Sequence, residues 1–567
     1  MKQTVLFSLV LVSALPAAAA GGSPSRAGLA LQAAPVEVLA PATAAAPDAI
    51  EAIARHNRAG RLPTRNGFAR DLERPRAVRL TAADLLRPTP FEVAGGVVTR
   101  TEAGSLVWSG EVAVTGAHGL RLHLSDVSLP PGSRLWTYAP GGAAVEIDPG
   151  WLGATGELWT GASFGDRARL DVEVPAAALA PGAEARFTLD RVLELVALGP
   201  DGSPLTGSEP FPKSSHCFVE MACAQEDFPS VVASYRLAVA VMFFVQDGSG
   251  FLCTGALLDD TDPTSRRPFL LTANHCVPDP AVASTVVSWF RFWNDGCGGP
   301  PTSGDQVVGA ALRATGASAD FSLLELSRLP PKPVFLDWTT ASPGPGTVVS
   351  LLSHARGRPQ VFSRHQVIPA NGCADPARFF MTTTVFGGAG PGASGAPVVN
   401  EQGRVVGTVS GGCGPNPGDG CDPTTTVIFG RFSRAFPDLA RFLDPEPKQE
   451  EPPDDGFLRT ASLPGFKFKV EITAGGETRE GVKEEACIPE TLCVSGAVAG
   501  RSEVFVRIVG PKPNGKLWPT LVKFTTSRVD VTVVQEATGE ERRYVLDGAA
   551  PGIDVLPGLF DRGGFDP

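Results

Sequence analysis

Three short segments in the second half of the chain decide its fold: Leu271-Thr-Ala-Asn-His-Cys276, Ser318-Ala-Asp-Phe-Ser-Leu-Leu-Glu-Leu326 and Gly392-Ala-Ser-Gly-Ala-Pro397. They supply a histidine, an aspartate and a serine in the order His275, Asp320, Ser394. Nucleophilic attack by a hydroxyl needs a base that takes its proton and a buried carboxylate that holds the base in the right tautomer. The order and surroundings of the three residues therefore predict a catalytic triad.

Taken singly, each segment has a simpler explanation. A histidine beside a cysteine can be structural, an aspartate before a strand is usually a turn residue, and Gly/Pro/Ser-rich segments are mostly plain loops. Around Ser394, however, the glycine-rich stretch leads directly into two apolar strands, which a plain loop does not require. The glycines allow a tight backbone in which the amides of Gly392 and Ser394 can converge on an oxyanion. Together the segments predict a serine peptidase.

Five segments carry a family resemblance: Cys253–Leu258, Leu271–Cys276, Ala319–Leu326, Pro391–Pro397 and Phe429–Arg431. From about Cys217 to Asp444 the chain resembles the bacterial lysyl endopeptidase-like family of chymotrypsin-fold (trypsin-like) serine peptidases. The resemblance implies an all-β double β-barrel with the active site in the cleft between the barrels. It also implies His275 as general base, Asp320 as its orienting residue, Ser394 as nucleophile, and the Gly392 and Ser394 amides as the oxyanion hole.

The sequence departs from this family at the specificity pocket. Lysine preference in the family comes from an aspartate two residues before an aromatic-Gly-Arg motif, and that position here is Val427. A valine cannot pair with an ammonium ion, and a buried unpaired lysine is costly. Gly388 stands six residues before Ser394, where trypsin-like enzymes keep an acid. We therefore expect a small or apolar side chain, rather than lysine, at the cleavage site.

Other residues near the pocket follow from the same comparison. Ser410, Gly411 and Gly412 are expected to form the strand edge that pairs with substrate backbone. Asp419 and Asp422 could fold inward to restore an acidic pocket, although acidic residues in a Gly/Pro/Cys-rich loop are more often solvated.

The first twenty residues predict a secretory signal peptide. Lys2 precedes an apolar run and an alanine tract that ends at Ala20, where we expect cleavage. The run is too short to cross a bilayer, so no membrane association is expected. The mature protein should be secreted, either extracellular or periplasmic.

All ten cysteines lie after residue 216, and an even number in an exported chain favours five disulfides. Metal binding is the rival, but the spacings are not those of a zinc site, and no metal or cofactor is expected. The resemblance implies the pairs Cys253–Cys276 and Cys223–Cys297, with Cys217 joined to Cys421 or Cys413 and Cys373 to the remaining partner. Cys487 and Cys493 would close a short local loop.

Residues 21–213 are predicted to be a pro-region. Its first part is rich in Ala, Pro and Arg, with one helix around 46–58 and the rest partly disordered. Short alternating strands from about 88 to 195 predict a β-sandwich, and a linker follows at 199–213. Folding aid or intramolecular inhibitor is the functional interpretation, and a retained binding module is the alternative. Lys213 is the expected processing point.

The peptidase domain is expected to span 214–444. A Pro/Glu-rich linker at 445–457 separates it from residues 458–567, whose alternating strands predict a second, accessory β-sandwich. Substrate or surface binding and a role in stability or export are both open for that domain.

The chain of 567 residues carries 49 Lys+Arg and 60 Asp+Glu, a formal net charge of −11 with no basic stripe, which argues against nucleic acid. We expect a monomer that acts on protein or peptide substrates. Two alternatives remain: a secreted binding protein that uses an inactive or highly restricted peptidase scaffold, and a narrow processing enzyme that acts on one partner.

Overall fold

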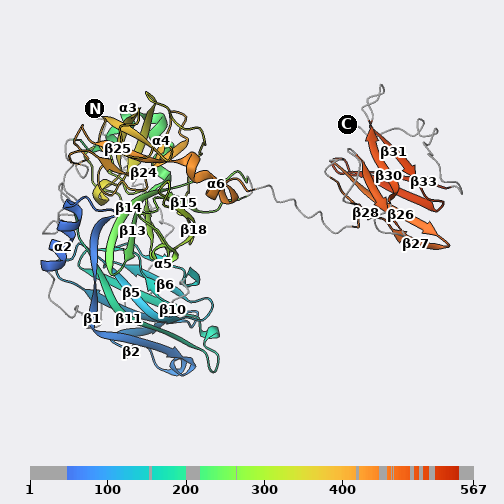
Figure 1. Cartoon of the computed structure of the whole chain (residues 1–567). Coiled ribbons are helices and arrows are strands. Elements are labelled where there is room, and N and C mark those ends of the chain that lie inside the picture. Colours follow the sequence, from blue (N-terminus) through green and yellow to red (C-terminus); the bar gives the residue numbers. More distant parts are fainter. Residues whose placement is uncertain are drawn as a thin grey trace, which may run out of the picture. The chain divides into compact units, whose positions relative to one another are not determined.

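The computed structural model describes residues 47–151, 156–198, 217–262, 265–416, 420–445, 456–460, 463, 465–484, 491–496, 502–509 and 517–547. The chain divides into two compact units, residues 1–446 and 447–567. The first unit contains both the predicted pro-region and the predicted peptidase domain (Figure 1). No helix of the described residues is long and apolar enough to span a membrane.

Two facing sheets form an N-terminal β-sandwich. One has the order β2 (Phe91–Val93), β3 (Gly96–Arg100), β4 (Leu106–Ala113), β10 (Arg167–Val174), β6 (Arg134–Tyr138), β7 (Val145–Ile147). The other contains β1 (Thr64–Thr81), β11 (Glu184–Leu195), β5 (Gly119–Ser128), β8 (Leu158–Trp159) and β9 (Ser163–Phe164). Alternating side chains of the two sheets, among them Leu122, Trp108 and Leu170, fill a continuous core.

The sandwich begins earlier than the sequence predicts. Its first strand is β1, at 64–81, whereas the sequence predicts the sandwich only from about residue 88 and partial disorder before it. The helix expected near 46–58 is α2 (Pro47–Arg58). Between Asp71 and Arg76 the register of β1 against β11 shifts, and charged residues follow one another there without alternation. Such a bulged strand lacks the period of two on which strand prediction depends. Three short 3₁₀ helices complete this region: η1 (Ala82–Leu86), η2 (Pro149–Trp151) and η3 (Ala176–Ala178).

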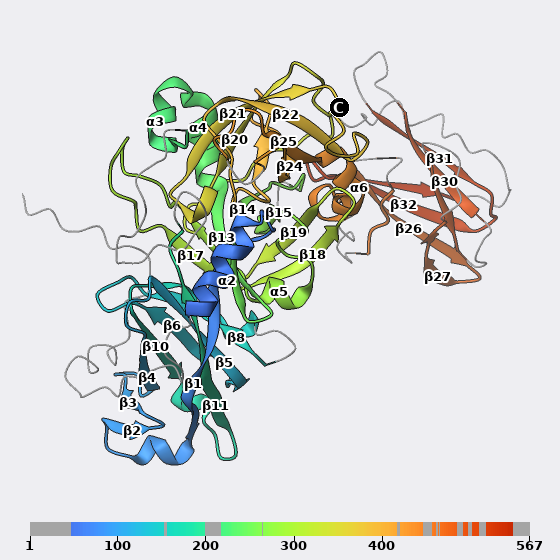
Figure 2. The same ribbon diagram turned by 60° about the vertical axis from the view of Figure 1, so that its left-hand side comes forward.

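The second sheet of the sandwich runs on into the first peptidase barrel. β1 pairs with β14 (Ser249–Leu257), and Thr64 lies opposite Leu252. The barrel strands follow the order β17 (Asp305–Val308), β16 (Val287–Phe290), β13 (Val239–Gln246), β14, β15 (Phe269–Thr272), β19 (Phe321–Leu326), β18 (Ala310–Gly316). Figure 2 shows β1 and β11 reaching from the sandwich toward these strands.

Six strands close the second barrel: β21 (Val361–Ile368), β20 (Val348–Ser353), β23 (Pro397–Val399), β24 (Val405–Cys413), β25 (Thr426–Arg431) and β22 (Phe379–Phe386), which pairs back with β21. The short β12 (Val219–Glu220) adds to β21. Helices around the barrels are α3 (Met221–Asp227), α4 (Pro229–Ala238), α5 (Pro280–Ser284), η4 (Ala355–Gly357) and α6 (Phe432–Leu443). One apolar cluster, which includes Leu271, Phe321, Leu352 and Leu439, joins the two barrels.

The second unit is a separate β-sandwich with its own core around Phe468, Val494 and Val531. Its two sheets have the orders β27 (Glu477–Glu480), β26 (Phe466–Ala474), β32 (Arg528–Gln535), β33 (Glu540–Leu546), and β28 (Val482–Lys483), β29 (Leu492–Ser495), β30 (Ser502–Val509), β31 (Trp518–Lys523). The predicted fold class, an all-β double barrel flanked by two β-sandwiches, is therefore confirmed.

Four disulfides join described cysteines: Cys217–Cys421, Cys223–Cys297, Cys253–Cys276 and Cys373–Cys413. Of the two partners that the resemblance left open for Cys217, the structure has Cys421. Cys487, the expected partner of Cys493, lies outside the described residues, as do Ala20 and Lys213.

Candidate active site

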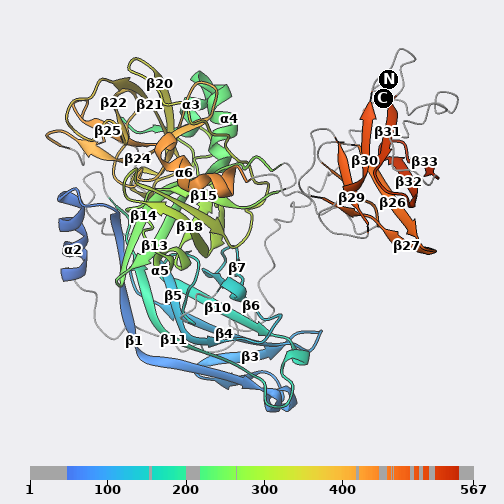
Figure 3. The same cartoon turned by 45° about the vertical axis from the view of Figure 1, so that its right-hand side comes forward.

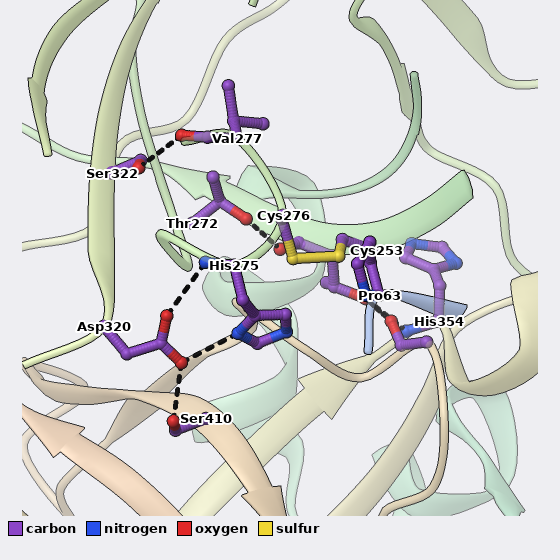
Figure 4. Close-up of a disulfide and its surroundings, with 12 residues drawn as sticks. Pro63, Cys253, Thr272, His275, Cys276, Val277, Asp320, Ser322, His354 and Ser410 are labelled. Carbon is purple, nitrogen blue, oxygen red and sulfur yellow. Dashed lines mark hydrogen bonds and ion pairs between the residues drawn. A yellow bond between two sulfur atoms is a disulfide. The ribbon is translucent and has the colours of Figure 1, made fainter. Parts of the chain in front are cut away.

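His275 lies in the turn that follows the fully buried strand β15, so the strand fixes the position of the His275 backbone. Its side chain is 20% exposed. A ring nitrogen lies within 4.8 Å of the sulfurs of both Cys253 and Cys276, so the disulfide walls one side of the ring. Figure 4 shows the ring between this disulfide and Asp320.

Asp320 stands directly before β19 with a φ of +51°, a backbone conformation that turns its buried carboxylate toward His275. It accepts three hydrogen bonds: from the His275 amide at 3.0 Å, from His275 Nδ1 at 2.8 Å and from Ser410 Oγ at 2.5 Å (Figure 4). Burial raises the pKa of Asp320, but these donors and the charge of His275 outweigh it, and the net pKa is lowered.

The ionised carboxylate decides the tautomer of His275. Because a carboxylate without its proton can only accept, Nδ1 must carry the hydrogen that lies on Asp320. In the neutral ring Nε2 is then left as the acceptor. Nε2 is buried and has no hydrogen-bond partner among the described residues, so no Ser394–His275 hydrogen bond is formed here. Such bonds are often long before substrate binds.

Ser394 sits in a tight turn between the barrels and is 3% exposed. Its carbonyl accepts a hydrogen bond from the Thr254 amide at 2.8 Å. The next residue, Gly395, has a φ of +79°, and a Cβ there would lie 2.2 Å from Thr272 Oγ1. The turn that carries Ser394 therefore packs directly on the end of β15, three residues before His275.

Gly392 shapes the other side of this turn. Its φ is +91°, and a Cβ would lie 2.7 Å from the Arg356 amide nitrogen. The Gly392 carbonyl accepts from Thr254 Oγ1 at 2.9 Å, while the amides of Gly392 and Ser394 donate to no group in the described part of the chain. An oxyanion hole requires backbone amides of this kind, which have no acceptor of their own and lie in one turn.

A cavity of about 150 Å³ opens beside Ser394. Within the described part of the peptidase domain, the residues that line it carry no charged side chain: Ala389, Gly390, Pro391, Ala393, Ser394, Val409, Gly411, Gly412, Thr425 and Val427. Of the residues predicted for the pocket, Gly411, Gly412 and Val427 lie on its wall. Asp422 does not line the cavity and accepts hydrogen bonds from Asn416 and Thr424 of its own loop, while Asp419 lies outside the described residues.

Gly388 and Ser410 do not line this cavity, although Ser410 lies on β24 as expected for the strand edge. A Cβ on Gly388 would lie 2.6 Å from the Gly420 carbonyl and 3.0 Å from Cys217 Sγ, so Gly388 packs against the disulfide loop instead. Ser410 directs its hydroxyl to Asp320. Sequence reasoning missed this contact because residues 90 positions apart meet only through the barrel fold.

The cavity has a second wall that no motif indicated. Asn57, Gly60, Arg61, Leu62 and Thr64, all from the predicted pro-region, line it opposite the peptidase residues. The sequence signals only a helix end and a turn at Ala59-Gly60, and nothing local to these residues says where the turn lies.

Comparison with known proteins places this site in a family. The family model "Lysyl endopeptidase, C-terminal domain" matches residues 211–420, which include His275, Asp320 and Ser394. A lysyl endopeptidase of Pseudomonas aeruginosa is 27% identical over 406 residues, which cover 65% of this chain and 86% of that protein.

Solved structures add little. An M. tuberculosis protease in its active form aligns with a TM-score of 0.27 and 20% identity, over 41% of this chain and 92% of that chain. Its inactive form gives 0.27 and 18%, over 38% and 94%. By its sequence, the part of the chain that carries the site is similar to the lysyl endopeptidase family of peptidases.

Proposed function

We propose that the chain is a secreted serine endopeptidase, made as a preproenzyme, with Ser394 as nucleophile, His275 as base and Asp320 as the group that orients the base. The observation that carries this proposal is the fixed tautomer of His275: Nδ1 donates to an ionised, buried Asp320, so Nε2 is ready to accept a proton. The turn of Ser394 packs on the same strand end.

In the first half of the reaction, His275 Nε2 takes the proton of Ser394 Oγ while Oγ bonds to the scissile carbonyl carbon. The carbonyl oxygen becomes an oxyanion that the amides of Gly392 and Ser394 stabilise. The C–N bond then breaks, and the leaving amine takes the proton from His275. An acyl-enzyme on Ser394 remains.

In the second half, water gives a proton to His275 Nε2 and its oxygen attacks the acyl carbon. The bond to Ser394 Oγ breaks, Oγ recovers the proton, and the new carboxylic acid leaves. The uncharged wall of the cavity favours a small or apolar side chain before the cut bond. Because no acidic side chain of the described residues lines the cavity, a lysine there would be buried without a counter-ion from them.

Labelling with a fluorophosphonate probe tests the assignment of the nucleophile. The secreted protein is labelled before and after digestion of the pro-region, next to the variants Ser394→Ala and Ser342→Ala. Ser342 is a matched control, because its exposed hydroxyl contacts only Ser433 among the described residues. We expect labelling that is lost in Ser394→Ala and kept in Ser342→Ala.

The same preparation tests the reaction with casein and with a peptide library. Broad degradation of casein indicates an endopeptidase of general use, and a single cut in one sequence indicates a narrow processing enzyme. Absence of labelling in every form would reject the enzyme and leave the two β-sandwiches as the functional parts of a binding protein.

A further inference from the structure

The cavity beside Ser394 is bounded by two parts of the chain that lie far apart in sequence. The turn Gly60–Thr64 closes the side that faces the peptidase wall of Gly411 and Val427. In this structure the turn therefore lies where a peptide substrate would have to enter to reach Ser394.

Side chains of α2 hold the turn in shape. Asn57 Oδ1 accepts from the Arg65 amide at 3.0 Å, and Asn57 Nδ2 donates to the Arg65 carbonyl at 2.9 Å. The His56 ring bonds to the Pro63 carbonyl through Nε2 at 2.9 Å. The chain leaves the helix through Gly60, which has a φ of +64°. Because hydrogen bonds join both ends of the turn to the helix, the turn has a defined conformation.

The helix itself is anchored on the first barrel. Ile53 is fully buried and packs in one cluster with Phe68, Phe243 and Leu252. The His56 ring lies 5.8 Å from the ring of Phe251 on β14. Figure 3 shows α2 alongside β14 and the upper end of β1. Full burial of an aliphatic side chain removes apolar surface from water and so helps to hold the helix in place.

Strand β1, which follows the turn Gly60–Thr64, pairs with a strand that contacts the turn around Gly392. Thr64 and Arg65 pair with Leu252 and Phe251 of β14. A Cβ on Gly392 would lie 2.6 Å from Leu252 Cδ1, so the residue opposite Thr64 also contacts the proposed oxyanion hole. Pro63 is among the residues that surround the Cys253–Cys276 disulfide in Figure 4.

Leu62 is the residue of the turn whose chemistry matches the pocket. Its Cδ1 lies 3.6 Å from the place of a Cβ on Gly411, ordinary van der Waals distance, and the wall there carries no charge. Leu62 remains 41% exposed. The Leu62 side chain thus lies partly in solvent and partly against Gly411, on the wall of the cavity.

We propose that the turn Gly60–Thr64 occupies the substrate cleft of the precursor as an intramolecular inhibitor, with Leu62 in the place of an aliphatic substrate side chain. This inference rests on the proposed function. It names the inhibitory segment, and it makes peptides with leucine or a similar aliphatic residue before the cut bond the substrate class.

Full-length precursors with Leu62→Asp and Leu86→Asp test the inference. Leu86 is the matched control, since it is 88% exposed and does not line the cavity. The rate of fluorophosphonate labelling of Ser394 is measured for both variants and the wild type. An unpaired carboxylate is costly against an apolar wall, so we expect Leu62→Asp to be labelled about tenfold faster than wild type or more. Leu86→Asp should match wild type.

The outcomes separate this inference from the proposed function. If the digested wild type is labelled but the Leu62→Asp precursor is labelled as slowly as the wild-type precursor, the inhibitory role of the turn is rejected and the peptidase stands. If no form is labelled, the peptidase itself is rejected. Thermal unfolding of each precursor establishes that faster labelling does not come from a loosened fold.

A second readout concerns the side-chain class and does not depend on the variants. The digested enzyme is given matched peptides with leucine, valine, lysine or aspartate before the cut bond. We expect kcat/KM to be highest for leucine and at least about a hundredfold lower for lysine, as an unpaired buried charge demands. A preference for lysine would overturn the role given to Leu62.

Discussion

Single residues set the chemistry of the cleft, and Ser410 is the one whose role was least visible in the sequence. Its hydroxyl is one of three donors to Asp320. Hydrogen bonds to a charged group are worth about 1.5–3 kcal/mol. In Ser410→Ala the ionised form of Asp320 is stabilised less, and the imidazole is held less firmly. We expect kcat/KM of the digested enzyme on a leucine peptide to fall about tenfold, with Ser342→Ala unaffected.

Asp320→Asn is the comparator for that measurement. An amide at this position favours the wrong tautomer of His275, for which losses of about 10⁴-fold are typical in such triads. A Ser410→Ala enzyme with unchanged kcat/KM would show that the third hydrogen bond does not matter for the reaction.

Val427→Asp should change the substrate class. Val427 is buried, and the described peptidase residues around the cavity carry no charge, so once the pro-region with Arg61 has been digested a carboxylate there would lack a partner among them until a basic side chain enters. We expect kcat/KM for a lysine peptide to rise and that for a leucine peptide to fall, which reverses the preference. Val385→Asp, at an exposed position of β22, is the control. Unchanged preference would place the specificity pocket elsewhere.

At the residue scale the sequence predicted the groups but not all of their contacts. His275, Asp320 and Ser394 could be chosen because their neighbours form short motifs. The cavity residue Val427 followed from the aromatic-Gly-Arg motif, and Gly411 and Gly412 followed from the expected strand edge. Ser410 lies on β24, as expected for the strand edge, but its bond to Asp320 and the cavity contact of Leu62 could not be predicted, because both depend on residues distant in the chain.

At the scale of secondary-structure elements, the N-terminal sandwich and the first barrel form one compact unit. Specific polar contacts join their strands. Gln306 of β17 donates from Nε2 to the Ala162 carbonyl and accepts from the Ala162 amide at Oε1, both at 2.8 Å. The fully buried Arg121 of β5 donates to the Thr285 carbonyl at 2.6 Å. Paired polar groups of this kind fix the orientation in which two apolar surfaces dock.

Gln306→Ala should weaken that docking. It leaves the amide and carbonyl of Ala162 without partners, at a cost of about 1–3 kcal/mol. After the linker is cut, we expect the pro-region to separate from the peptidase about tenfold more readily, as measured by size-exclusion chromatography over a range of concentrations. Gln366→Ala, on an exposed part of the second barrel, should behave as wild type. Equal dissociation of the two variants would contradict the docking role.

At the element scale, regular strands were predictable and irregular ones were not. Strands such as β26 and β32 alternate buried and exposed residues or carry β-branched runs, and the sequence located them. β1 could not be recognised because its bulge and its charged residues interrupt the alternation. Its pairing with β14 is a contact across almost two hundred residues that no local pattern encodes.

On the scale of the whole molecule, the two compact units imply that the second can be removed. A chain that ends at residue 445 retains the complete core of both barrels. We expect the digested, shortened enzyme to cleave a short peptide with kcat/KM within about twofold of the full-length enzyme, because independent domains keep their own cores. A large loss would show that the C-terminal sandwich supports catalysis.

The stability of the precursor should fall in acid because histidines are buried. Burial lowers the pKa of His354 to about 4 and that of His365 to about 3. Both stay neutral in the folded state below pH 6.5, whereas the unfolded chain binds protons there. Stability is therefore full above pH 6.5 and is lost as the pH falls toward 4, by about 1.4 kcal/mol per pH unit for each histidine.

Thermal unfolding between pH 7.5 and pH 4.5 measures this slope. In His365→Asn, the fall of stability with pH should be smaller by the contribution of one histidine, because the buried titrating ring is gone. Ser363 and Thr384 still meet a polar side chain in this variant. A melting temperature that does not change with pH in this range would contradict the prediction.

The pairing of β1 with β14 has a consequence for the timing of activation. Hydrogen bonds between strands do not depend on an intact linker, so a single cut near Lys213 leaves β1, α2 and the turn in place. We therefore expect activation in two steps: the cut removes the covalent tether, and activity appears only when the N-terminal part dissociates. Because dilution favours the dissociation of two separate chains, a cut precursor should stay inactive where it is concentrated and become active as it is diluted.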